Sequence, residues 1–159
     1  MSSVDYRGSE DKAIIIMAAI IEKDRKLLMV QEGKEEAGGK WNVPAGHIIF
    51  GEDPLEAVKR EVKEETGFEV EPTELGRVFA FNDSENVPVL RFNVYCKLTG
   101  ETSEREPTIL DISWYGKDEL ETMRDKGELR SKRTWMTIQD WIENKRFPLE
   151  TINVRKEKL

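Results

Sequence analysis

The chain has 159 residues, of which 38% are hydrophobic and 36% charged, and its 25 basic and 32 acidic side chains give a net charge of -7. This length predicts one domain with a single core. The acidic balance argues against binding to a nucleic-acid polymer, which needs a basic surface, but allows a small phosphorylated ligand. The single cysteine, Cys96, excludes an internal disulfide and a cysteine-based zinc cluster, and it favours a cytoplasmic setting.

We expect residues 1–12 to be a loose N-terminus, residues 13–152 to form the domain and residues 153–159 to be a charged tail. The polar start of the chain, MSSVDYRGSEDK, is not typical of a signal peptide. The longest apolar run, residues 13–21, is shorter than the roughly 20 residues of a membrane-spanning helix. Either a monomer or a homodimer is compatible with the sequence.

Two strands are predicted first, and a helix follows. The isoleucine-rich residues 13–21 indicate a buried strand, residues 26–31 a second strand, and residues 32–40 a glycine-containing loop. Residues 53–66 are the clearest helix. Asp53 is its expected N-cap, with Pro54 at the first helical position, Glu56 at capping-box spacing and Gly67 as the stop. The apolar stripe of this helix consists of Leu55, Val58 and Val62.

The rest of the chain alternates strands with helices. Residues 90–98 alternate apolar and polar side chains, which predicts a half-buried strand, with residues 77–81 as its antiparallel neighbour. Cys96 falls on the apolar phase of this strand and is expected to be inert core. Residues 109–115 predict a further strand. Two helices are expected at residues 117–124 and 131–145, and the core face of the second comprises Trp135, Ile138 and Ile142. Helices packed on a mixed or antiparallel sheet indicate an α/β or α+β domain.

Acidic residues are crowded on one side of the predicted helix. At 100° per residue, Glu61, Glu64 and Glu65 fall within an arc of about 100°. Such carboxylates are the ligands that hard divalent cations prefer. The alternative is an ordinary solvated face on which Lys59 and Lys63 neutralise the acids.

The wider pattern resembles the signature of the Nudix hydrolases. Gly46, Glu52 and the run REVKEETGF from Arg60 match that signature at every specified position across 23 residues. The upstream WNVPAGH, which begins at Trp41, and the later pair Trp114-Tyr115 also look like that family. This resemblance covers about residues 13–152.

The resemblance implies an α/β/α sandwich with a mixed sheet and a metal-dependent pyrophosphohydrolase that acts on a nucleoside diphosphate linked to a further group. By matching motif positions, Glu61 and Glu65 would be the main metal ligands, Glu64 would lie close by and the carbonyl of Ala45 would join them. The expected cofactor is Mg²⁺, with Mn²⁺ as the alternative.

The catalytic roles stay open at this point. Arg60 would hold Glu52 or Glu64 in position, and Glu64 or Glu61 would act as the base. Many family members carry a further glutamate before the late strand, but this chain has Thr108 at the matching position. The two nearby acids that are alternatives for its role are Glu106 and Asp111.

The substrate class rests on further resemblances. Residues 89–92, 129–131 and 146–150 look like bacterial Nudix phosphatases of nucleoside tri- and diphosphates and of pyrimidine or thiamine pyrophosphates. Residues 30–46 also resemble an animal branch that acts on oxidised guanine nucleoside diphosphates. Both favour a small nucleotide-like pyrophosphate. The alternatives are an ADP-ribose or other sugar-nucleotide pyrophosphatase, and a nucleotide-sensing module without turnover.

Two arginines and four aromatic residues are candidates for substrate binding. Arg91, on the polar phase of its strand, either grips a phosphate or is an exposed strand arginine. Arg130 either lines the site or only precedes the helix that Ser131 caps. The aromatic residues that either stack a base or belong to the core and sheet surface are Trp41, Phe79, Phe81 and Tyr95.

Overall fold

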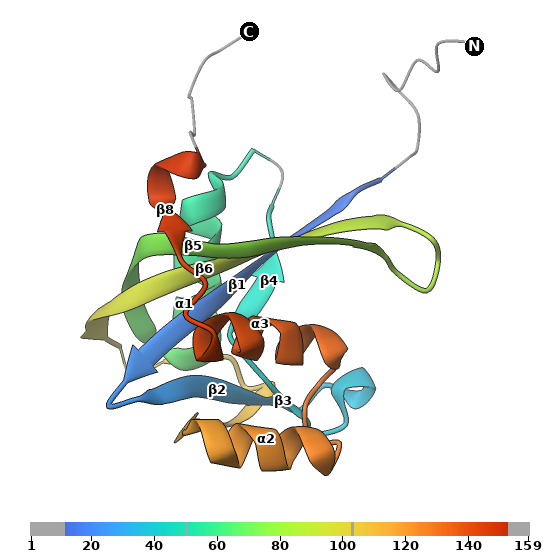
Figure 1. The fold of residues 1–159 in the computed structure, drawn as a ribbon, viewed down its shortest axis with the longest axis vertical. Helices are drawn as coiled ribbons and strands as arrows, with labels where there is room; N and C mark the ends of the chain where they lie inside the picture. Colours follow the sequence, from blue (N-terminus) through green and yellow to red (C-terminus); the bar gives the residue numbers. More distant parts are fainter. Residues whose placement is uncertain (1–11, 50, 103, 153–159) are drawn as a thin grey trace, which may run out of the picture.

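The computed structural model describes residues 12–49, 51–102 and 104–152 (Figure 1). The strands are β1 (Ile14–Lys23), β2 (Lys26–Glu32), β3 (Trp41–Asn42), β4 (Ala45–His47), β5 (Phe68–Asn82), β6 (Pro88–Glu101), β7 (Ile109–Tyr115) and β8 (Phe147–Pro148). The helices are α1 (Pro54–Thr66), α2 (Lys117–Asp125) and α3 (Lys132–Ile142), with short 3-10 turns η1 (Glu35–Ala37) and η2 (Leu149–Thr151). The expected charged tail, and the expected loose N-terminus apart from Lys12, lie outside the described residues.

The strands form one mixed sheet in the order β3-β2-β1-β6-β5-β8, with β4 paired to β1 and β7 paired to β2. β1 runs parallel to β6, whereas β5 and β6 form a long antiparallel hairpin. Met17 of β1 pairs with Gly46 of β4, so the glycine turn is attached to the centre of the sheet.

Helices cover both faces of the sheet, as expected for an α/β/α sandwich (Figure 1). α1 packs on one face through Ala57, Val58 and Val62. α2 and α3 pack on the opposite face, where Leu120 and Ile138 are fully buried. The predicted fold class is therefore confirmed. No helix in the described parts of the chain is both long and apolar enough to cross a membrane.

The helix that carries the acidic motif begins and ends where local chemistry predicts. The side chain of Asp53 accepts a hydrogen bond of 2.8 Å from the backbone N–H of Leu55, and Pro54 starts the helix. Gly67 ends it in the left-handed conformation with φ of 75°, a region that glycine enters without steric cost. The capping box expected at Glu56 is wrong, because that side chain accepts from Lys59 instead.

The expectation that residues 90–98 form a half-buried strand is also wrong. These residues belong to β6, which lies between β1 and β5 and is covered on both faces. On its polar phase, Arg91, Asn93 and Tyr95 are only 4%, 1% and 3% exposed. Cys96 is buried, as predicted. Alternation therefore located the strand correctly, but it did not reveal that α3 covers the polar phase.

Several boundaries differ from expectation. The strand expected at residues 77–81 is the end of the longer β5, whose register shifts near Pro72 and Gly76 interrupt the pairing with β6. The short strands β3 and β4 were not predicted, and η1 lies within the expected loop. Helix α3 ends at Ile142, three residues early, and Asn144 beyond it has a positive φ of 52°.

Candidate active site

A hollow of about 460 Å³ lies where the glycine turn, α1 and the segment before β7 meet, and we call it the acid pocket. Its glutamates are Glu32, Glu36, Glu61, Glu64, Glu65 and Glu106. Its other lining residues are Lys34, Ala45, Gly46, His47, Ile49, Thr108, Ile109 and Arg130. The structure therefore brings the predicted metal ligands Ala45, Glu61, Glu64 and Glu65 to one place.

Gly46 lets a carboxylate of α1 pack directly against the backbone of β4. A Cβ atom at this position would lie 2.0 Å from Cδ of Glu61 and 2.2 Å from each of its carboxylate oxygens. No side chain can occupy that space, so glycine is required for close approach. The glycine of the motif is thus required for a steric reason.

Glu65 is the most deeply placed acid of the motif, with 9% of its surface exposed. One carboxylate oxygen accepts a hydrogen bond of 3.0 Å from the backbone N–H of Ala45. Burial raises the pKa of Glu65 well above its ordinary value, opposed by that hydrogen bond and reinforced by the charges of Glu61, Glu32 and Glu106. A bound cation would relieve this crowding of negative charge.

Arg60 connects the acids at the mouth of the pocket. It grips Glu52 by two bonds, Nε to Oε1 at 2.7 Å and Nη2 to Oε2 at 3.0 Å. Its Nη1 donates to Glu61 at 2.7 Å and to Glu64 at 3.2 Å, and Nη2 also donates to the carbonyl of His47 at 3.0 Å. Arg60 lowers the pKa of Glu52. By contrast, burial raises the pKa of Glu61 despite Arg60.

Both alternatives for the partner of Arg60 are therefore present, and Glu52 is the bidentate one. The idea that Lys59 and Lys63 neutralise the acidic face is wrong. Lys59 pairs with Glu56 at 3.3 Å and Glu71 at 3.5 Å, and Lys63 pairs with Glu69 at 3.0 Å. Neither lysine therefore neutralises an acid of the pocket.

The donor set fits a hard divalent cation. It consists of carboxylate oxygens, with Ala45 also lining the pocket, and such oxygen-rich sites suit Mg²⁺ or Mn²⁺. Within the described residues, no three histidine, cysteine or acidic side chains are arranged so that they alone could hold a metal ion. Mg²⁺ usually binds through one or two carboxylates plus water and substrate phosphates, so an incomplete protein shell is compatible with it.

Of the two acids weighed against Thr108, Glu106 lines the acid pocket and Asp111 does not. The backbone N–H of Glu106 donates to the carbonyl of Glu64 at 2.7 Å, which ties the segment before β7 to the end of α1. The Glu106 carboxylate accepts from Thr108 Oγ1 at 3.2 Å. Asp111 is exposed on β7 and accepts from the N–H of the adjacent Ile112.

Glu32 is a pocket residue that the sequence analysis missed. At the end of β2, its two carboxylate oxygens accept bonds of 2.9 Å from Nδ2 of Asn42 and Nε of Arg130. Arg130 therefore lines the pocket, while Ser131 caps α3 through a 3.4 Å bond to the N–H of Thr134. The two roles considered for this segment, pocket lining and helix capping, are therefore both present in the structure. An acid at the end of a buried strand was the available signal.

The other substrate candidates do not line the acid pocket. Arg91 is buried against α3, so it is neither an exposed strand arginine nor a lining residue. Trp41 packs edge-on against Tyr115 with ring centroids 5.1 Å apart. The other candidate aromatic rings face guanidinium groups: Phe79 faces Arg77 at 5.6 Å, Phe81 faces Arg133 at 4.1 Å, and Tyr95 faces Arg146 at 3.9 Å.

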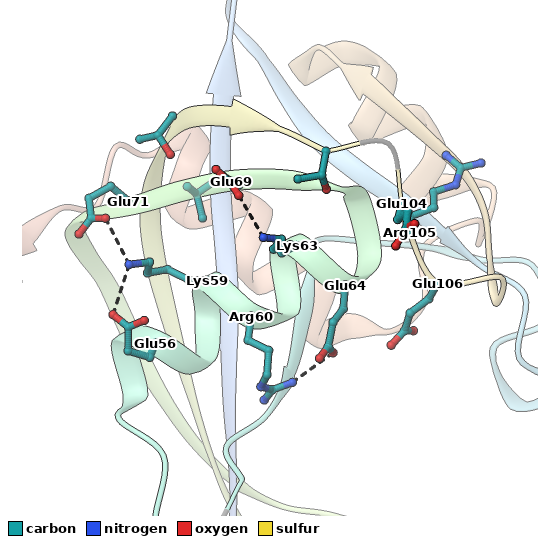
Figure 2. Close-up of a pocket in the computed structure, with 13 residues that line it drawn as sticks. Glu56, Lys59, Arg60, Lys63, Glu64, Glu69, Glu71, Glu104, Arg105 and Glu106 are labelled. Atoms are coloured by element: carbon teal, nitrogen blue, oxygen red, sulfur yellow. Dashed lines mark hydrogen bonds and ion pairs between the residues drawn. The ribbon is translucent and has the colours of Figure 1, made fainter.

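A larger open groove of about 970 Å³ runs along the outer side of α1, next to the acid pocket (Figure 2). Figure 2 shows Lys59 between Glu56 and Glu71, and Lys63 beside Glu69. The groove shares only Glu64 and Glu106 with the acid pocket. Because the motif acids Glu61 and Glu65 lie in the smaller hollow, the acid pocket is the candidate active site.

Comparison with known proteins settles the family. The NUDIX domain family matches residues 11–144 of this chain. The chain belongs to the NUDIX family of hydrolases. Phosphatase NudJ of Escherichia coli K12 is 30% identical over 143 residues, covering 89% of this Nudix chain and 91% of NudJ. The human 8-oxo-dGDP phosphatase NUDT18 is 32% identical over 112 residues, which cover 68% of this chain but only 33% of the human protein.

A solved structure supports the same assignment. A NUDIX hydrolase from Nitrosomonas europaea superposes with a TM-score of 0.83 at 29% identity, covering 92% of this Nudix chain and 100% of that one. The fold predicted from the motif is thus shown. This chain spans about a third of the length of some of its relatives, including NUDT18, and nearly all of NudJ.

Proposed function

We propose that this Nudix chain hydrolyses the phosphoric anhydride bond of nucleoside di- or triphosphates or similar small pyrophosphates, with Mg²⁺ as cofactor and Mn²⁺ as an alternative. The observation that carries the proposal is the buried carboxylate of Glu65 beside Glu61, with no cationic side chain bonded to Glu65 among the described residues. The names of NudJ and NUDT18 support a phosphatase of nucleotide-like compounds.

In this proposal, Glu61, Glu65 and the carbonyl of Ala45 hold the metal, with Glu64 close by. When bound, the metal neutralises phosphate oxygens and lowers the pKa of a water molecule. Arg60 orients Glu52 and Glu61 through charge-assisted bonds, which fixes the wall of the pocket.

Glu64 is the proposed base, because it has the freest carboxylate of the motif. Its side chain is 42% exposed and receives one bond of 3.2 Å from Arg60, whereas Glu61 is 13% exposed and bonded at 2.7 Å. Glu106 lies at the shared edge of the two hollows and is the alternative acceptor of the proton. Arg130, which faces the pocket beside Glu32, is the proposed contact for a substrate phosphate.

The test of this function is release of phosphate and pyrophosphate from a substrate panel, with Mg²⁺ and with chelator. The panel holds ordinary and oxidised nucleoside di- and triphosphates, thiamine and pyrimidine pyrophosphates, ADP-ribose and dinucleoside polyphosphates. We expect metal-dependent turnover of nucleoside di- or triphosphates. Turnover of ADP-ribose alone would identify a sugar-nucleotide pyrophosphatase, and binding without turnover would identify a sensing module.

The variant Glu65→Gln should lower kcat by about 100-fold, because changes to residues that only support a metal ligand already cost roughly 10- to 100-fold, and Glu65 is itself a proposed ligand. It should leave the fold intact, since the amide keeps an acceptor for the N–H of Ala45. The matched control is Glu71→Gln, which removes the same charge from the exposed end of β5. Near-full activity in Glu65→Gln would contradict the metal assignment.

A further inference from the structure

The far half of β5 is an open edge of the sheet. In the described parts of the chain, β8 pairs with β5 only at Glu74 and Leu75. Residues 77–82 therefore have β6 on one side and no described strand on the other. In Figure 1 this end of the β5–β6 hairpin extends past the helices. An open edge presents backbone N–H and C=O groups that can pair with a further strand.

The turn of the hairpin shows which backbone groups of β5 point outward. The backbone N–H of Asp83 donates to the carbonyl of Val87 at 3.0 Å, so these two residues form a hydrogen-bonded pair. Hydrogen-bonded and non-hydrogen-bonded pairs alternate along antiparallel strands, and the register with β6 is regular over residues 78–82. The residues whose N–H and C=O groups point away from β6 are therefore Val78, Ala80 and Asn82.

This edge lacks the charges and prolines that usually protect a sheet edge from pairing. Residues 78–81 have the sequence VFAF, which is uncharged and mostly favours strands. Val78 is 48% exposed. In the next row of the same face, Leu90 pairs with Ile15 on one side and Ala80 on the other, and all three are exposed or nearly so. Adjoining exposed apolar side chains are typical of an interaction surface.

The side chains of this edge are complementary to a second, antiparallel copy of the same edge. Alignment about a twofold axis at Ala80 places Phe79 opposite Phe81 of the second copy, and aromatic cross-strand pairs are favourable. At the ends of the segment, Arg77 lies opposite Asp83 of the second copy, so no like charges meet. Such self-complementarity is what a twofold interface requires.

The backbone pattern and the length of the edge fit the same alignment. Val78 lies opposite Asn82 of the second copy and Ala80 lies opposite its own counterpart, so the outward N–H and C=O groups face one another as hydrogen-bonded pairs. The aligned segment ends at residue 77, shortly before β8 takes over the edge at Leu75. The second copy therefore covers the open part of the edge.

We propose that two copies of this chain associate through the outer edge of β5, antiparallel about a twofold axis at Ala80, and so form one continuous sheet. Ala80 lines neither the acid pocket nor the groove along α1. Each copy thus keeps its own acid pocket, and the association does not depend on hydrolysis.

The first test is the mass of the wild-type protein in solution, measured by sedimentation velocity from about 1 to 100 µM. We expect the mass to rise from that of one chain to twice that value within this range, because an edge contact of this length belongs to the small, weak class of interfaces. Hydrogen exchange of the backbone amides in residues 77–83 should slow over the same concentrations, since pairing protects them.

Charge at the axis tests the register. Ala80→Lys places two ammonium groups opposite each other, and Ala80→Glu places two carboxylates there, so each should weaken association about tenfold. An equimolar mixture of the two variants should associate again, because lysine then faces glutamate. Ala80→Thr is the matched control, since it is neutral and favours a strand, and it should associate like the wild-type protein.

Folding of the variants is checked by thermal unfolding. The Ala80 side chain is exposed, so all three variants should keep the melting temperature of the monomeric wild-type protein within a few degrees. A wild-type protein that keeps the mass of one chain up to 100 µM would overturn the proposal. Association of folded Ala80→Lys as strong as that of Ala80→Thr would also overturn it, as would a mixture of the charged variants that stays monomeric.

Discussion

Two carboxylates are buried on opposite faces of the sheet, and the protein treats them differently. Asp140 of α3 is 0% exposed and accepts from Nε of Arg77 at 2.5 Å, from the backbone N–H of Arg77 at 2.8 Å and from Nδ2 of Asn93 at 2.8 Å. Glu65 of α1 is 9% exposed and accepts one bond, from the N–H of Ala45.

The difference separates a structural acid from a candidate functional one. Every partner of Asp140 belongs to the chain, and they join α3 to β5 and β6. Tyr95 adds a bond from its hydroxyl to the Asp140 carbonyl. Glu65 is surrounded by further acids, so the chain itself increases its charge cost. A site that increases a charge cost in this way is suited to a cationic ligand.

The largest expected effect is on stability, at Asp140. Asp140→Ala should lower the free energy of unfolding by about 3 kcal/mol, because it leaves the buried amide of Asn93 and the backbone N–H of Arg77 without an acceptor. Chemical denaturation measures this directly. Glu143→Gln is the control, since the bond from Arg77 to Glu143 is 3.3 Å long and exposed, and its loss should cost under about 0.5 kcal/mol. A small effect of Asp140→Ala would show that the hydrogen bonds to Asp140 do not stabilise the fold, so Asp140 would not be a structural acid.

The next effect is stabilisation by metal. A cation that binds only the native state should raise its stability by about 2.7 kcal/mol at a concentration 100 times its dissociation constant. Thermal unfolding with increasing Mg²⁺ or Mn²⁺ should show this rise in the wild-type protein. Asp140→Asn should keep the metal-dependent shift, measured from its own lower starting point, and Glu65→Gln should lose it. An equal metal-dependent rise in the stability of Glu65→Gln would show that the metal binds elsewhere.

The sequence was most predictive for features that depend on residues close together along the chain. Helix α1 was located because Asp53, Pro54 and Gly67 act on neighbouring backbone groups. The acids of the pocket were located because helical periodicity places Glu61, Glu64 and Glu65 together. Neither inference needs knowledge of distant contacts.

Long-range contacts explain what the sequence did not predict. Burial of Arg91 depends on α3, which follows it by more than 40 residues and supplies Thr137. Glu32 and Arg130 meet across 98 residues. Glu106 was foreseen only as one of two alternatives, because its place in the pocket depends on the backbone bond to Glu64.

The smallest effect involves a third buried acid, the thiol of Cys96, which tests whether a raised pKa alone marks a functional site. Burial, with a smaller contribution from Glu71, raises the pKa of Cys96 from 9.0 to about 12. The thiol packs in the core on the α1 face and lines neither hollow. Its pKa therefore has a structural cause, and we expect no change in turnover in Cys96→Ala.

The raised pKa of Cys96 still has a measurable consequence. Since the folded state keeps the thiol protonated, its stabilising contribution is complete below pH 9 and is lost as the pH rises from 9 toward 12. Between pH 8 and 10.5 the wild-type protein should lose about 2 kcal/mol more stability than Cys96→Ala, whose lower overall stability does not affect this slope. Denaturant midpoints at several pH values measure the difference.

Parallel slopes in the two proteins would show that the thiol reaches water in the native state. A steeper loss in the wild-type protein, without loss of activity in the variant, would show that burial alone produces a raised pKa. The case for Glu65 then depends on the further acids around it and on its response to metal.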